Sequence, residues 1–402
     1  MRQIPLGRTG LRVSEMIFGG APIGGLYAPV TDDQAAAALE AAWTAGIRAF
    51  DTAPHYGVGL SEQRIGHFLS GRPREEYVLS TKVGRRLVPA TGDVEGAEGF
   101  YGTPKLARVR DYSRDGALAT LEGSLRRLGT DHIDIALIHD PDDYAEQALD
   151  GAYAALDQLR SEGTIRAVGV GMNQAPLLEW FIERADLDFV LVAGRYSLLD
   201  ITAAHALFPA CQRRGIAVLA AGVFNSGILA EPRPGATYDY APAPVGLLDR
   251  AQRIRAVCAC YGVPIGAAAI RFVLRHPAVT AIVVGARDAA EVNEDVSYLT
   301  AAVPAELFDE LAAEQLIPTT VDRPLSSTHH HPGPCRPDGQ LGHADRPGEW
   351  GAISDRDPTG QRATGRSRGR TARRPPEMRA ADSAHSTAST TEQPSTARKL
   401  PT

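Results

Sequence analysis

Short apolar segments alternate with longer amphipathic segments along most of this chain, and this alternation restricts its fold more than any other feature. The short segments are continuously apolar, as are strands buried on both faces of a parallel sheet. We expect strands at residues 16–19, 47–50, 77–82, 133–138, 165–170, 189–192, 216–220 and 281–284. We expect helices at residues 31–45, 61–69, 116–128, 145–162, 175–183, 203–213, 246–260, 265–275, 289–299 and 305–314.

Eight strand–helix units in this order predict an α/β fold with a parallel sheet. Eight units over roughly 300 residues favour a closed (β/α)8 TIM barrel over an open doubly wound sheet. Thr31 and Gln34 have the spacing of a capping box at the start of the first helix. Segments 3–6 and 12–14, joined by a glycine-containing turn, predict an N-terminal β-hairpin that closes the bottom of the barrel.

The composition changes near Thr319. Residues 319–402 are rich in Pro, Ser, Thr, Arg and Gly and have almost no aliphatic periodicity. Such a segment cannot bury enough apolar surface to offset the entropic cost of ordering it. We therefore expect one barrel domain over residues 1–318 and a disordered low-complexity tail over residues 319–402. The arginine cluster at 366–374 is compatible with a tail that binds an anionic partner, but we favour a non-functional extension.

Charge and composition exclude several classes of function. The net charge of −6 gives no reason to expect binding to nucleic acid. The amino terminus has no apolar signal region, and no apolar run reaches membrane-spanning length. The four cysteines do not have the spacing of a zinc site. We therefore expect a cytoplasmic protein that contains no metal and acts on a small molecule.

Polar residues stand where three successive strands are expected to end. Asp51 follows the second strand, Lys82 closes the third and His139 follows the fourth. Tyr56 lies in the loop beyond Asp51. Because active sites of TIM barrels lie at the carboxyl ends of the strands, we expect these four side chains to meet at one rim. Each alone has a structural explanation, such as a helix cap or a core histidine, but their occurrence together on adjacent strands favours a catalytic group.

This set of residue types is suited to proton transfer. A free tyrosine has a pKa near 10, and the ammonium of Lys82 beside Tyr56 would favour the phenolate, with Asp51 holding the lysine. Tyr56 could then exchange a proton with a substrate hydroxyl or carbonyl, and His139 could donate a hydrogen bond to the same oxygen. No serine or cysteine stands beside a base at this rim, which disfavours acyl transfer. A proton donor without a nucleophile suggests hydride transfer with a cofactor.

The runs FDTAPHYG (50–57), VLSTKVG (78–84), LRRLGTDHIDIALIHDPD (125–142) and IRAVGVGMNQ (165–174) resemble the aldo-keto reductase superfamily over roughly residues 3–317. Within it, the chain is most similar to a bacterial subgroup of aldose and pyridoxal dehydrogenases. The resemblance implies a barrel that binds a nicotinamide cofactor without a Rossmann domain. It also implies that Asp51, Tyr56, Lys82 and His139 form the family tetrad, with Tyr56 as the acid and base.

The resemblance further implies a set of cofactor contacts, which are Met172, Asn173, Gly222, Phe224, Asn225, Ser226, Gly227, Gly285, Arg287, Glu291, Glu294 and Asp295. Three positions at the nicotinamide end depart from the family pattern. Met172 replaces a frequent serine before the carboxamide-binding Asn173, and Ala193 replaces a glutamine under the nicotinamide. Ala221 replaces a tyrosine that stacks on the nicotinamide ring, so we expect the stacking residue elsewhere, with Phe224 as a candidate.

The segment 283–295 resembles the part of the family that holds the adenosine end of the cofactor. NADP-preferring members often carry a lysine and an arginine at the positions of Gly285 and Glu291. A 2′-phosphate would here meet several carboxylates, with only Arg287 to balance them. We therefore expect NAD as the cofactor, with NADP as the alternative. Asp288 and Glu291 also have the spacing of a helix N-cap and its third residue, which is the purely structural explanation of both.

These observations favour an NAD-dependent dehydrogenase that oxidises a sugar lactol or a similar polar alcohol. One alternative is an NADPH-dependent reductase of aldehydes and ketones, and another is a dehydrogenase of pyridoxal. A non-catalytic protein that senses the cofactor is a further possibility, which the intact tetrad disfavours.

Overall fold

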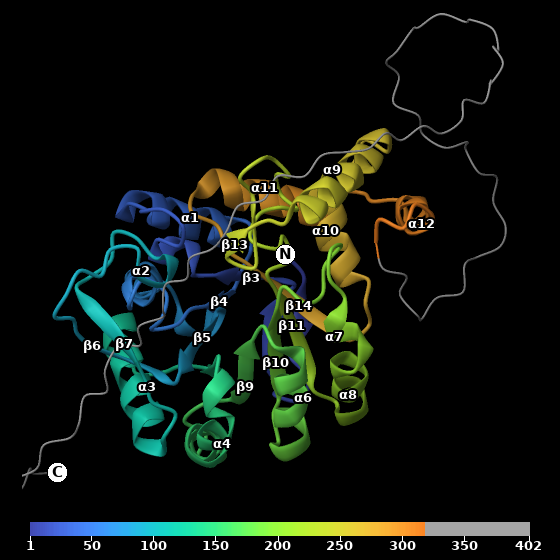
Figure 1. The fold of residues 1–402 in the computed structure, drawn as a ribbon. Helices are drawn as coiled ribbons and strands as arrows, with labels where there is room; N and C mark the ends of the chain where they lie inside the picture. Colours follow the sequence, from blue (N-terminus) through green and yellow to red (C-terminus); the bar gives the residue numbers. More distant parts are fainter. Residues whose placement is uncertain (318–402) are drawn as a thin grey trace, which may run out of the picture. The chain divides into compact units, whose positions relative to one another are not determined.

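The computed structural model describes residues 1–317, in which eight parallel strands close into a barrel (Figure 1). Neighbouring strands follow chain order, and the last pairs with the first through Ile282 and Met16. The strands are β3 (Met16–Gly19), β4 (Ala49–Asp51), β5 (Val78–Val83), β8 (Ile135–His139), β9 (Ala167–Met172), β10 (Phe189–Ala193), β11 (Ala217–Ala221) and β14 (Val279–Val284). The predicted TIM barrel is confirmed, whereas the predicted tail lies outside the described residues.

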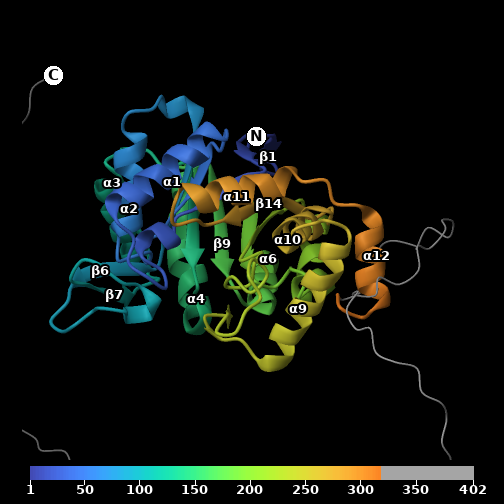
Figure 2. The same cartoon turned by 90° about the horizontal axis from the view of Figure 1, so that it is seen from above.

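Helices surround the barrel on its outer side (Figure 2). They are α1 (Asp32–Thr44), α2 (Leu60–Leu69), α3 (Arg114–Leu128), α4 (Ala145–Gln147), η5 (Ala148–Tyr153), α5 (Ala154–Ser161), α6 (Ala175–Arg184), α7 (Thr202–His205), α8 (Leu207–Arg214), α9 (Val245–Cys260), α10 (Ile265–Leu274), α11 (Ala289–Thr300) and α12 (Ala305–Ala313). The predicted capping box is present, since Thr31 Oγ1 accepts from the Gln34 amide and the Gln34 side chain accepts from the Thr31 amide.

Two predicted helices differ from the structure. Residues 145–162 form a helix that contains a π-helical segment, η5, between α4 and α5. Residues 203–213 are divided into α7 and α8 at Ala206. The division has a physical reason, because it places Pro209 in the first turn of α8, where a proline costs no helical hydrogen bond.

The predicted amino-terminal hairpin is confirmed. Its strands β1 (Gln3–Pro5) and β2 (Arg12–Ser14) pair antiparallel. Leu6, Leu11 and Val13 from this hairpin are buried with apolar side chains of the barrel strands, such as Phe189. The hairpin therefore closes the end of the barrel at which the strands begin.

The segment 85–112, where we predicted neither strand nor helix, contains a second hairpin. Its strands are β6 (Arg85–Pro89) and β7 (Leu106–Arg110), which pair antiparallel. A small third hairpin, β12 (Thr237–Tyr238) with β13 (Ala241–Pro242), lies in the loop after β11. Single-turn helices complete the described chain, namely η1 (Pro22–Gly24), η2 (Arg74–Glu76), η3 (Ala97–Gly99) and η4 (Asp142–Tyr144). The long loops are thus partly ordered by their own strand pairing.

No single helix within residues 1–317 is long and apolar enough to cross a membrane. Helices α9 and α10 reach that length and composition only as a pair, across a bend of 96°.

Helices α2 and α3 approach so closely that Gly66 has no room for a side chain. A Cβ atom there would lie 2.2 Å from the carbonyl oxygen of Leu128. We expect Gly66→Ala to lower the free energy of unfolding by more than about 2 kcal/mol, because backbone must move to relieve the clash. Gly71→Ala is the matched control, since nothing lies within 4 Å of a Cβ at that position. Equal urea midpoints for the two variants would contradict the expectation.

Candidate active site

The four side chains predicted to meet do meet, at the end of the barrel where the strands finish. Asp51 and His139 are the last residues of β4 and β8, and Lys82 lies one residue before the end of β5. Lys82 Nζ donates to Asp51 Oδ2 at 2.6 Å and to the Tyr56 hydroxyl at 3.0 Å. The rings of Tyr56 and His139 meet edge to face, with centroids 5.6 Å apart.

The ammonium of Lys82 is fully enclosed by oxygen acceptors. Besides Asp51 and Tyr56, it donates to the Thr52 carbonyl at 3.0 Å. The second oxygen of Asp51 accepts from Ser80 Oγ at 2.7 Å, across the β4–β5 register. Burial alone would discharge the lysine, but Asp51 and Tyr56 together raise the pKa of Lys82 above its usual value. The lysine is therefore held charged and in one position.

The protonation of Tyr56 differs from what the sequence led us to expect. Burial raises the pKa of the Tyr56 phenol more than the neighbouring Lys82 lowers it, and Asp51 adds to the rise. In this structure Tyr56 is a neutral phenol at pH 7, which suits it to donate a proton to a carbonyl oxygen.

His139 is held as a neutral imidazole. Burial lowers its pKa well below the usual value, and the positive charges of Arg85 and Lys82 lower it further. Tyr112, which is fully buried, places its hydroxyl 2.6 Å from the His139 carbonyl and 2.7 Å from that of Asp140. This contact fixes the backbone at the end of β8. His139 can therefore donate a hydrogen bond to a substrate oxygen, but it lacks the acidic second proton of an imidazolium at neutral pH.

The hairpin β6–β7 supplies charged residues that sequence reasoning did not identify. Arg85, which is 7% exposed, donates to Asp140 at 2.7 Å, and its guanidinium lies 3.6 Å from Glu98. Glu98 and Asp140 both have positive φ, at 53° and 41°, which is strained for residues other than glycine. The period-two pattern of RRLVP and LARVR could have revealed the two strands. Nothing in the sequence placed Glu98 at the rim.

The predicted cofactor contacts lie in three groups, each at the carboxyl end of a barrel strand. Met172 is the buried last residue of β9, and Asn173 follows it. The Asn173 amide donates to Asp239 at 3.3 Å, and Asp239 in turn accepts from Arg195 at 2.7 Å. Asp239 belongs to the turn between β12 and β13, so the β12–β13 hairpin contacts the residue expected to bind the nicotinamide carboxamide.

The second group is the turn after β11, which includes Gly222, Phe224, Asn225, Ser226 and Gly227. Asn225, Ser226 and Gly227 all have positive φ, at 45°, 58° and 98°, so the turn holds a strained left-handed backbone. The buried Asn225 Oδ1 has no hydrogen-bond partner within residues 1–317. An acceptor without a partner fits a bound group that donates a hydrogen bond, such as a ribose hydroxyl. Phe224 packs edge to face on Tyr298 of α11, with centroids 6.4 Å apart, which places it toward α11.

The third group, around the start of α11, contains Gly285, Arg287, Glu291, Glu294 and Asp295. Glu291 binds Arg287 twice, accepting from its backbone amide at 2.8 Å and from its Nε at 2.9 Å. Asp288 caps the helix by accepting from the Glu291 amide, as its spacing predicted. Burial, with Glu291 and Glu294 nearby, raises the pKa of Asp295 to about 8. Carboxyl groups therefore dominate this end of the site.

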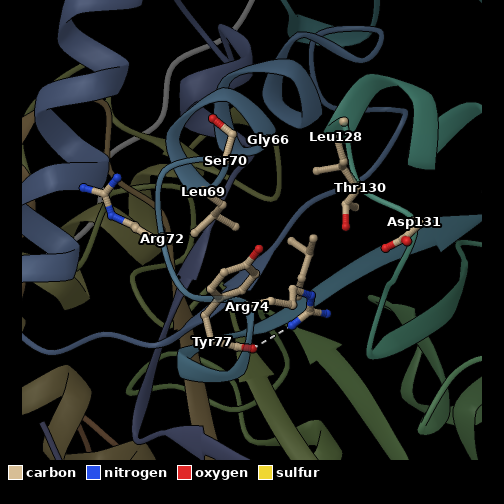
Figure 3. A pocket seen from close by; sticks show the side chains of 11 residues that line it. Gly66, Leu69, Ser70, Arg72, Arg74, Tyr77, Leu128, Thr130 and Asp131 are labelled. Atoms are coloured by element: carbon tan, nitrogen blue, oxygen red, sulfur yellow. Dashed lines mark hydrogen bonds between the residues drawn. The ribbon is translucent and has the colours of Figure 1, made fainter.

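One pocket of the described residues lies away from the tetrad. It has a volume of about 510 Å³ and is lined by the ends of α2 and α3 and the start of β5, including Arg74 and Tyr77 (Figure 3). Because β5 begins there, this pocket opens at the end of the barrel opposite the tetrad. Within residues 1–317 no cluster of three or more His, Cys, Asp or Glu side chains could hold a metal ion.

Comparisons with known proteins agree with this geometry. The model of the Aldo/keto reductase family matches residues 15–314. A D-threo-aldose 1-dehydrogenase of a Pseudomonas species is 42% identical over 318 residues, covering 77% of this chain and 97% of that protein. A pyridoxal 4-dehydrogenase of Microbacterium luteolum is 41% identical over 332 residues, covering 78% and 97%.

The structural likeness leads to the same family. An aldo-keto reductase of Bacillus halodurans, solved in its holo form, superposes with a TM-score of 0.62 at 26% identity. The match covers 79% of this chain and 97% of that one. The chain therefore belongs to the aldo/keto reductase family and is an NAD(P)-dependent oxidoreductase.

Proposed function

We propose that the protein is an NAD-dependent dehydrogenase that oxidises the lactol carbon of a free sugar. The observation that carries this proposal is the bonded set Asp51–Lys82–Tyr56 with the neutral ring of His139 against the tyrosine. This set can move one proton to or from an oxygen and contains no nucleophile. A proton-transfer group of this kind complements hydride transfer. The cofactor, when bound, supplies or accepts the hydride.

In oxidation, Tyr56 as the phenolate accepts the proton of the lactol hydroxyl. Lys82 stabilises the phenolate from 3.0 Å, and Asp51 keeps the lysine in place. His139 orients the same substrate oxygen by a hydrogen bond from its neutral ring. In reduction, the neutral phenol returns the proton. Each tetrad residue thus acts at a single oxygen of the substrate.

The relatives support the choice of substrate. The Pseudomonas enzyme is named for oxidation of D-threo-aldoses, and the Microbacterium enzyme for pyridoxal. Both are about equally similar to this chain, so pyridoxal is the second candidate substrate. Both names describe dehydrogenases, which favours oxidation over the general reduction of aldehydes and ketones that remains the alternative.

The preference for NAD rests on the carboxylates near α11. Glu291 lies at the position where NADP-preferring members often carry an arginine. It already forms an ion pair with the Arg287 guanidinium. A 2′-phosphate would have to displace this ion pair and approach the carboxylate of Glu294 as well. Asp295, whose pKa is raised to about 8, is mostly protonated at pH 7 and adds little repulsion. A ribose with free hydroxyls meets carboxylates as hydrogen-bond acceptors instead.

Turnover of L-fucose, D-arabinose and pyridoxal with NAD and with NADP tests the proposal. We expect NAD-linked oxidation of at least one of these compounds. Tyr56→Phe should lower kcat by at least about a hundredfold, because it removes the acid and base, while the dissociation constant for NAD stays within about twofold. Good NADPH-linked reduction of aldehydes without any NAD-linked oxidation would favour the reductase. Absence of turnover in both proteins, with NAD binding intact, would indicate a cofactor sensor.

The raised pKa of Tyr56 predicts the pH dependence of oxidation. Only the phenolate accepts a proton, and below the pKa its fraction grows about tenfold with each pH unit. We therefore expect kcat/KM for lactol oxidation to rise from pH 6 to 9, whereas reduction, which uses the phenol, stays flat over this range. The lowered pKa values of His55 and His139 exclude both rings as the source of the rise. A flat profile for oxidation would mean that the pKa of Tyr56 lies below 6.

A charge reversal at residue 291 tests the cofactor preference. We expect Glu291→Arg to raise kcat/KM for NADP by at least about tenfold, because it removes a carboxylate, releases Arg287 and adds a phosphate ligand. Glu306→Arg on the exposed face of α12 makes the same change in net charge and is the matched control. A wild-type protein that already prefers NADP would overturn the assignment to NAD.

A further inference from the structure

A chain of charged contacts links two histidines at the rim. His55 Nδ1 lies 3.5 Å from Glu98 Oε2, and the same oxygen lies 3.6 Å from the guanidinium of Arg85. Arg85 donates to Asp140 at 2.7 Å, and Asp140 lies 3.4 Å from His139 Nε2. One guanidinium therefore bridges two carboxylates, each of which faces one imidazole. His139 belongs to the tetrad, whereas His55 has no role in the reaction described so far.

The ring of His55 is held on several sides. It meets Phe100 and His139 edge to face, with centroids 5.1 and 5.5 Å away, and lies 5.9 Å from the ring of Tyr56. Its backbone carbonyl accepts two hydrogen bonds from Arg108, at 2.9 and 3.2 Å. His55 is thus anchored by the hairpin β6–β7 as firmly as the tetrad is anchored by the barrel.

The contacts of each ring decide which nitrogen carries its proton. Nδ1 of His55 makes no hydrogen bond within the described residues, and the carboxylate of Glu98 lies 3.5 Å from it. This carboxylate favours the proton on Nδ1, which leaves Nε2 as an acceptor. Nδ1 is buried, and the 13% of the side chain that is exposed belongs to the rest of the residue. Asp140 instead faces Nε2 of His139, while Nδ1 of that ring is buried without a partner. Asp140 favours the proton on Nε2 of His139 but makes no hydrogen bond to it in this geometry, so that N–H can donate to a substrate oxygen. His139 therefore presents Nε2 as a donor, whereas His55 presents Nε2 as an acceptor.

Both rings are neutral at physiological pH. Burial lowers the pKa of His55 well below its usual value, and Arg85 and Arg108 lower it further. The same guanidinium of Arg85 acts on His139. A neutral donor beside a neutral acceptor matches two adjacent oxygens of a substrate, of which one accepts a hydrogen bond and the other donates one.

We propose that His55 is a second substrate-binding residue, which accepts a hydrogen bond from a hydroxyl on the carbon next to the reacting carbon, and that Glu98 is the positioning residue that fixes its tautomer. The site thereby selects α-hydroxy aldehydes and their lactols over simple aldehydes. This inference rests on the proposed function, since His139 and Tyr56 must bind the reacting oxygen for His55 to reach its neighbour.

Reduction of lactaldehyde and of propanal with NADH tests the inference, because the two aldehydes differ only in the α-hydroxyl. We expect wild type to favour lactaldehyde in kcat/KM by about 10- to 100-fold, the usual effect of one buried hydrogen bond that a substrate lacks. His55→Phe keeps a planar ring against Phe100 but removes the acceptor, so the ratio should fall to within about threefold of unity. His55→Gln places an amide oxygen near the lost Nε2 and should restore part of the ratio.

The positioning role of Glu98 has a separate readout. We expect Glu98→Ala to lower the lactaldehyde to propanal ratio, because the tautomer of His55 is then no longer fixed. Glu95→Ala removes a carboxylate from the same hairpin and is the matched control, since Glu95 bonds only to the amide of Gly102 across the hairpin loop. A purely structural role for Glu98 would change the melting temperature and leave the ratio as it was.

The outcomes separate this inference from the proposed function. A wild type that reduces both aldehydes equally, or a ratio unchanged in His55→Phe, would overturn the role of His55 even if lactols are oxidised. A wild type that oxidises no lactol but shows a ratio that His55→Phe abolishes would overturn the proposed function and leave His55 as the selecting residue. A wild type that reduces neither aldehyde and oxidises no lactol would overturn both.

Discussion

The buried ion pair between Lys82 and Asp51 is the interaction on which the active end of the barrel depends. Their side chains are 1% and 6% exposed, so neither charge would be stable there without the other. Removing one partner of such a pair typically costs about 3–5 kcal/mol, because an uncompensated charge remains buried. The pair forms only if β4 and β5 keep the register that sets Asp51 opposite Ser80. Proton transfer and strand register are therefore coupled through one contact.

The sequence could predict the parts of the site that lie on regular elements. Asp51, Lys82 and His139 lie at or next to the carboxyl ends of barrel strands. These ends meet at one rim independently of the conformation of the loops. The motif around Tyr56 is local, so its position followed from the strand before it. The protonation of Tyr56 was not predictable in the same way, because burial depends on the whole fold. Its pKa is raised where the lysine alone would have lowered it.

The parts that could not be predicted lie on long loops. Glu98 reaches His55 only because β6 and β7 pair and return the chain over the barrel, a contact between residues 43 positions apart. Asp239 contacts Asn173 because it lies in the turn of the small hairpin β12–β13, which no sequence pattern predicted. Phe224 was expected as a candidate to stack on the nicotinamide, and its contact with Tyr298 instead favours a place beside the adenosine half. Sequence patterns report periodicity within an element, and these contacts join different elements.

The charges around the tetrad argue for a neutral substrate. Lys82 is paired with Asp51, and Arg85 is shared by Asp140 and Glu98. Arg108 donates to backbone carbonyls, among them that of His55. These cations already have partners, so a substrate anion would gain little from them and would approach Glu98 and Asp140 at the same time. Neutral hydroxyl groups, by contrast, can bond to both imidazoles without disturbing any ion pair. The ion pairs of the rim therefore support the uncharged, hydroxylated substrate proposed above.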